Sequence, residues 1–149
     1  MDFYKKWFSK SKEIQLVGFE DMKYAIQYQY MIINTLAIME QECVIKGTMQ
    51  YDKEEHIINK CMETNDKEGI IIIYGKNSAD YTVYEKYNQL TKHGFYNVHI
   101  YSGGLFEWLL LQDIYGYQEF PTMGKCQDML KYRATVSLQK HKLLCITGK

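Results

Sequence analysis

The chain has 149 residues, of which 46% are hydrophobic and 24% charged, and its 18 basic residues balance its 18 acidic ones. This length and composition predict one folded domain and exclude a largely disordered protein. No apolar run approaches the ~18 residues of a membrane span, and the first eight residues lack the apolar core of a secretory signal, so we expect a soluble, cytoplasmic protein with no membrane partner.

Apolar runs and helical periodicity alternate along the chain. Short apolar runs predict strands at 14–17, 30–35, 43–45, 70–74 and 98–101. Helical spacing predicts helices at 19–29, 53–62, 80–93 and 104–115, with Asp52 and Asp80 as candidate N-caps and Gly94 as a left-handed stop. This alternation indicates an α/β domain with a mainly parallel five-stranded sheet and helices on both faces.

Charge is unevenly distributed near the C-terminus. Every acidic residue precedes Met129, whereas the segment 129–149 contains Lys131, Arg133, Lys140, Lys142 and Lys149. We therefore divide the chain into a domain at 1–128, with a C-terminal extension from about 116, and a basic tail at 129–149. The tail is expected to be solvated or to lie against the acidic body. A contact with an acidic partner or with nucleic acid is the alternative.

The cysteines do not form a recognisable metal or disulfide pattern. Cys43, Cys61, Cys126 and Cys145 are far apart, which favours reduced thiols. His141 and Cys145 are four residues apart, but a single such pair does not predict a metal site. We expect neither a metal nor a cofactor. Trp7 and the lysines around it would give only weak contact with a membrane surface.

Three landmarks occur in a defined order. The first is Ile33-Asn34-Thr35-Leu36 followed by Ile45-Lys46-Gly47-Thr48, and the second is the loop Gly75–Asp80 after the apolar run 70–74. The third is Gly94-Phe95-Tyr96-Asn97-Val98 followed by Ser102-Gly103-Gly104 and Trp108. In this order they resemble the rhodanese (sulfurtransferase) family over residues 12–115. The resemblance implies a single three-layer rhodanese-like domain. The segment 109–132 resembles an extension seen on rhodanese-like proteins of protists and large DNA viruses.

The resemblance places the active-site loop of the family at Gly75, Lys76, Asn77, Ser78, Ala79 and Asp80. Active members begin this loop with a cysteine that carries a persulfide, and glycine at position 75 cannot do so. Asp80 stands where active members often have an arginine, Asn34 replaces a usual aspartate, and Leu36 replaces a usual arginine. A carboxylate at Asp80 would repel an anionic substrate. Lys76 is the cation in the loop and the candidate for binding a small anion.

The sequence therefore predicts a catalytically inactive, rhodanese-like module that binds an unidentified protein partner or a second copy of itself. The alternative is a sulfurtransferase, or a persulfide- or anion-binding protein, that uses a thiol outside the loop. Cys126 is the candidate thiol, if the extension folds back over the loop. A phosphatase of a related fold would need both a cysteine and an arginine in the loop, and the loop contains neither.

Overall fold

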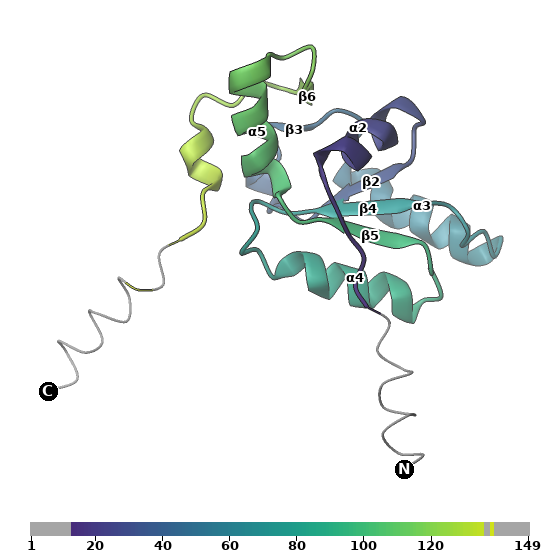
Figure 1. The fold of residues 1–149 in the computed structure, drawn as a ribbon. Helices are drawn as coiled ribbons and strands as arrows, with labels where there is room; N and C mark the ends of the chain where they lie inside the picture. Colours follow the sequence, from purple (N-terminus) through teal and green to yellow (C-terminus); the bar gives the residue numbers. More distant parts are fainter. Residues whose placement is uncertain (1–12, 136–137, 139–149) are drawn as a thin grey trace, which may run out of the picture.

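The computed structural model describes residues 13–135 and residue 138. Its main sheet consists of parallel strands in the order β1 (Leu16–Val17), β5 (Val98–Tyr101), β4 (Ile71–Tyr74) and β2 (Met31–Asn34) (Figure 1). The α/β class and the parallel sheet are confirmed.

The expected number of strands is wrong, since the main sheet has four strands instead of five. The run expected at 43–45 forms β3 (Val44–Ile45), which pairs antiparallel with β6 (Thr122–Met123) in a second, two-stranded sheet. The Ile45 N–H donates to the Tyr74 hydroxyl (3.1 Å) instead of to a strand backbone. The second sheet forms because residues 116–124 return to β3, and no apolar run in the sequence marked β6 as a strand.

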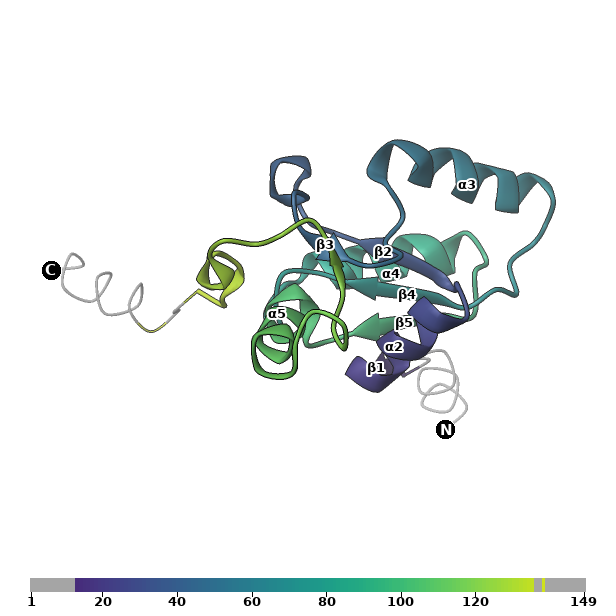
Figure 2. The ribbon, with the colours of Figure 1, turned by 90° about the horizontal axis from the view of Figure 1, so that it is seen from above.

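Helices cover both faces of the main sheet, as predicted. One face packs against α2 (Phe19–Gln27) and α5 (Gly104–Tyr115), and the other against α3 (Tyr51–Glu63) and α4 (Thr82–Lys92) (Figures 1 and 2). Alternation along β4 serves both layers, since Ile72 and Tyr74 face the first layer while Ile71 and Ile73 face the second. The central strand is therefore buried on both faces.

The majority of helix ends differ from the predicted ends by one or two residues. The helix expected to follow Asp52 begins at Tyr51, so Asp52 lies in its first turn and Gln50 precedes it as the cap residue. The helix expected to begin at Asp80 begins at Thr82 after Tyr81. Gly94 follows the end of α4 with φ of 94°, so the predicted left-handed stop is confirmed.

The C-terminal part of the described chain packs against the body. After α5, residues 116–124 lead into β6, and the 3₁₀ helix η2 (Met129–Tyr132) then contacts α5 (Figure 2). Tyr132 is fully buried, and Lys131 forms an ion pair with Glu42 (3.1 Å). This part of the predicted basic tail thus lies against an acidic group of the body.

Several sequence predictions fall on residues outside the described part of the chain. These are Trp7, the pair His141 and Cys145, and the basic residues Lys140, Lys142 and Lys149. The division at residue 128 stays a prediction. Within residues 13–135, no helix has the length and apolar character needed to cross a membrane.

Candidate functional site

The Gly75–Asp80 loop connects β4 to α4 at the carboxyl edge of the parallel sheet, where open α/β sheets usually bind ligands. Its first two carbonyl groups accept hydrogen bonds from the start of α5: Leu105 N–H donates to Gly75 O (2.9 Å) and Phe106 N–H to Lys76 O (2.8 Å). Gly104 permits this contact, because its φ is 68° and a Cβ there would lie 2.8 Å from Gly75 O. The loop backbone is therefore held by the neighbouring helix.

The Asp80 carboxylate ties the two ends of the loop together. Its Oδ2 accepts from Lys76 N–H (2.9 Å), and its Oδ1 accepts from Thr82 N–H (3.0 Å) and the Thr82 hydroxyl (2.6 Å). The Thr82 hydroxyl also forms a hydrogen bond with the Thr35 hydroxyl at the end of β2 (2.7 Å). The prediction that Asp80 is the N-cap residue is wrong, since Tyr81 holds that position. The Asp80 carboxylate still accepts a hydrogen bond from the first amide of the helix, Thr82 N–H.

The same carboxylate fills the space over Gly75. A Cβ built on Gly75 would collide with Asp80 Oδ2 and lie 2.9 Å from its Cγ and 3.0 Å from Val83 Cγ1. Real Cβ contacts are almost never this short, so a side chain at position 75 requires Asp80 to move. Nothing in the residue pattern indicates this contact, because it depends on the side-chain conformation of Asp80.

Lys76, the candidate anion ligand, is engaged by a carboxylate. Its Nζ lies 2.8 Å from Glu40 Oε1, and the two side chains are 38% and 24% exposed. Glu40 Oε2 is buried without a hydrogen-bond partner among the described residues. An anion at Lys76 would therefore have to compete with Glu40, and the assignment of Lys76 stays a prediction.

The remaining polar side chains of the loop serve the local structure. Asn77 Oδ1 accepts from Ala79 N–H (2.9 Å), whereas Ser78 is exposed. Asn34, at the end of β2, is buried and accepts from Leu36 N–H (3.0 Å). These bonds shape the loop and the neighbouring strand end.

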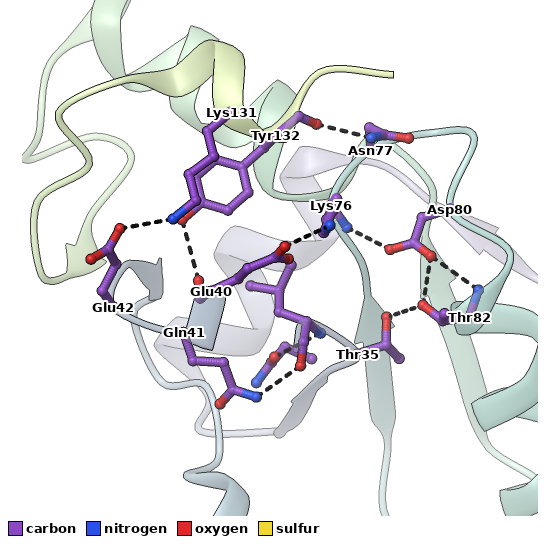
Figure 3. A network of polar contacts seen from close by, with 12 residues as sticks. Thr35, Glu40, Gln41, Glu42, Lys76, Asn77, Asp80, Thr82, Lys131 and Tyr132 are labelled. Atoms are coloured by element: carbon purple, nitrogen blue, oxygen red, sulfur yellow. Dashed lines mark hydrogen bonds and ion pairs between the residues drawn. The ribbon is translucent and has the colours of Figure 1, made fainter. Parts of the chain in front are cut away.

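A C-terminal segment closes the outer side of the loop (Figure 3). We call residues Met129–Arg133 the strap. Asn77 Nδ2 donates to the Tyr132 carbonyl (2.9 Å), and the Tyr132 hydroxyl donates to Glu40 O (3.2 Å). Sequence reasoning assigned the strap to the tail and missed its role, since nothing in its spacing marks Tyr132 as a buried residue.

We expect alkaline pH to weaken the strap. Burial raises the pKa of Tyr132 from 10.0 to about 12, with smaller contributions from Cys126 and Cys43. The folded protein thus favours the neutral phenol, so its stabilising effect is complete below pH 10 and is lost as the pH rises to about 12. Urea unfolding across this range should show a larger loss of stability for the wild type than for Tyr132→Phe. Equal losses in the two proteins would contradict this role.

None of the described cysteines lies in the loop. Cys126 is half-buried and lines a pocket of about 300 Å³ together with residues of α5 and the strap, but no residue of the Gly75–Asp80 loop lines that pocket. Cys43 is buried, and burial raises its thiol pKa. Cys61 lines a different pocket together with Gly69 and Ile70, at the start of β4. The structure therefore does not place Cys126 among the loop residues.

The described residues show no arrangement suited to a metal ion. In residues 13–135, no group of three or more His, Cys, Asp or Glu side chains is placed to hold one. The charged groups at the loop are Asp80, Lys76 and Glu40, of which the last two neutralise each other. The loop side chains thus take part in hydrogen bonds and in one ion pair.

Comparisons with known proteins identify the fold. Residues 7–111 match the family model described as a Rhodanese-like domain. The chain is similar to the crystal structure of the Alr3790 protein from Anabaena sp., with 22% identity and a TM-score of 0.52, over 84% of this chain and 99% of that one. The solution NMR structure of the Rhodanese-like domain of the same Anabaena protein matches with 22% identity and a TM-score of 0.50, over 85% of this chain and 93% of that one. No curated protein matches the chain.

Proposed function

Because the chain belongs to the rhodanese-like domain family, we propose that it is a non-catalytic member that binds a protein partner. The observation that carries this proposal is the Asp80 carboxylate over Gly75. By resemblance, Gly75 stands where active members carry the nucleophilic cysteine. In this conformation the Asp80 carboxylate lies where the Cβ of a cysteine would stand, so a cysteine at position 75 would require Asp80 to move.

The charges around the loop also disfavour the substrates of sulfur transfer. Thiosulfate is a dianion, and at the loop it would meet the carboxylates of Asp80 and Glu40. At about 4 Å and an effective dielectric constant near 20, each pair of like unit charges opposes binding by about 4 kcal/mol before screening. One lysine that is already paired does not offset two carboxylates. We therefore assign no anionic substrate to the loop.

A binding role is supported by exposed apolar side chains beside the loop region. The 3₁₀ helix η1 (Ile38–Glu40) presents Ile38 and Met39, which are 61% and 90% exposed. Both line a groove of about 740 Å³ together with Tyr51 and Met123. Apolar side chains gathered in this way are typical of surfaces that bind proteins. A second copy of the chain, a cytoplasmic location and a protist or viral origin stay predictions.

Sulfur transfer or persulfide binding through Cys126 is the second candidate. The thiol is half-buried and lines a pocket beside Lys125, which gives a small molecule a route to it. This candidate lacks the loop amides and the helix N-terminus that stabilise a thiolate in the family loop.

A thiosulfate:cyanide sulfurtransferase assay separates the two candidates. We expect the wild type and Cys126→Ser to show the same rate as a protein-free blank, with an active rhodanese as the positive control. Activity in the wild type that is lost in Cys126→Ser would establish the second candidate. Activity that survives in Cys126→Ser would overturn the non-catalytic proposal and direct attention to the other thiols.

A further inference from the structure

We propose that the surface beneath the strap is a recognition surface for a short segment that carries a basic residue next to an aromatic one, and that the strap is its internal occupant. This inference rests on the proposed binding function and names the class of partner. The strap itself, Met129–Arg133, shows which chemistry the surface accepts (Figure 3).

Two consecutive strap residues supply the contacts. The Tyr132 side chain is fully buried in the cluster that contains Cys43 and Trp108, and its hydroxyl donates to Glu40 O (3.2 Å). Lys131 pairs with Glu42 (3.1 Å). The surface thus combines a pocket for one aromatic ring with an acidic rim.

A third contact binds the main chain of the strap. Asn77 Nδ2 donates to the main-chain carbonyl of Tyr132 (2.9 Å). A carbonyl is present in every peptide, so this bond would align an incoming segment without reading its sequence. It also connects the occupant directly to the Gly75–Asp80 loop. Any segment that replaces the strap would therefore contact the same loop.

The strap is built so that it can be released. It is a single 3₁₀ turn, η2, too short to be stable without the surface beneath it. Leu130 and the Lys131 side chain are 54% and 43% exposed, so the apolar attachment comes from the buried Tyr132 ring and the half-buried Met129. An exposed ion pair such as Lys131–Glu42 adds little to this attachment. A competing segment thus has to displace few contacts.

Charge specifies the kind of competitor. The strap carries Lys131 and Arg133. On the surface beneath it, Glu42 pairs with Lys131 of the strap, whereas Glu40 pairs with Lys76 of the loop. An acidic segment would be repelled by Glu42 and would lose the pairing that Lys131 makes. The surface therefore fits a basic and aromatic partner segment.

The test uses a fluorescent peptide with the sequence of residues 128–133, Asp-Met-Leu-Lys-Tyr-Arg, and measures its anisotropy with the full chain. Tyr132→Ala empties the aromatic pocket, so we expect this protein to bind the peptide at least about 10-fold more tightly than the wild type does. A peptide with alanine in place of tyrosine should bind Tyr132→Ala about 10-fold more weakly. A peptide with glutamate in place of lysine should bind it about 2- to 5-fold more weakly, because the ion pair with Glu42 is exposed. Leu130→Ala, which changes an exposed strap residue, should behave like the wild type.

The inference is overturned if Tyr132→Ala is folded by circular dichroism and binds the three peptides equally, or binds none of them at about 1 mM. If Tyr132→Ala does not fold, Lys131→Ala/Tyr132→Phe is used, because it keeps the ring and removes two polar contacts. It should bind the peptide more tightly than the wild type, and an affinity equal to that of the wild type contradicts the inference. Failure here leaves the sulfurtransferase result unchanged, so the two proposals can fail separately.

Discussion

Replacing Trp108 with alanine is expected to lower the free energy of unfolding by about 3–5 kcal/mol, the usual range for removing a large buried aromatic side chain. Trp108 is fully buried in α5 and packs edge-on against Phe120, with ring centroids 5.0 Å apart. Its Nε1–H donates to Pro121 O (3.1 Å). The one side chain therefore anchors the returning segment 116–124 as well as the sheet face.

Urea unfolding followed by circular dichroism measures this loss. Trp108→Phe is the matched control, because it keeps an aromatic ring and removes the N–H donor that Pro121 O accepts. It should lower stability by about 1–3 kcal/mol, the range for a buried group left without its partner. A loss below about 1 kcal/mol for Trp108→Ala would mean that the segment 116–124 is held without this contact.

The fold could be predicted because its signals are local. The run Ile70–Tyr74 identifies a strand buried on both faces, and Gly94 marks the end of α4. The second sheet could not be predicted, since β6 is two residues long and its pairing with β3 depends on a chain reversal over residues 116–121. Short elements formed by tertiary contacts leave no period in a sequence.

The sequence predicted where the candidate site lies, but it did not predict the contacts within the site. The order of the motifs located the Gly75–Asp80 loop, and the sequence showed its lack of a thiol. The three contacts that define its present state are the Asp80 carboxylate over Gly75, the Lys76–Glu40 pair and the Tyr132 strap. Each joins residues whose approach is set by side-chain rotamers or by chain reversal. The sequence around Glu40 and Tyr132 contains no motif or spacing that indicates a contact with the loop, so neither residue could be assigned to the site before the fold was known.

The contact between Gly75 and Asp80 gives the second large effect. Gly75→Ala is expected to lower the free energy of unfolding by about 1–3 kcal/mol, as overpacking usually does. The added Cβ would collide with Asp80 Oδ2 and lie 3.0 Å from Val83 Cγ1. The φ of Gly75 lies outside the left-handed region, so the backbone itself tolerates alanine. Without the collision, this substitution would be neutral or stabilising by about 0.4–1 kcal/mol.

A double-mutant cycle isolates the collision. Asp80→Ala removes the carboxylate and with it the collision. In this background, the loss of stability caused by Gly75→Ala should be smaller than in the wild type, by at least about 0.5 kcal/mol. Asp80→Asn is the matched control, because it keeps the volume of the side chain and should leave the effect of Gly75→Ala undiminished. Denaturant unfolding of all six proteins gives both coupling energies. Equal effects of Gly75→Ala in the three backgrounds would show that Asp80 moves aside freely.

The coupling bears on function because a cysteine has the same Cβ as alanine. If the cycle shows the expected coupling, Gly75→Cys should be destabilising by itself and should become tolerated together with Asp80→Ala. A thiol at position 75 and a carboxylate at position 80 would then exclude each other in this conformation of the loop. In that case a cysteine at position 75 would need a second substitution at position 80, and the coupling would define Gly75 and Asp80 as one structural unit of the loop.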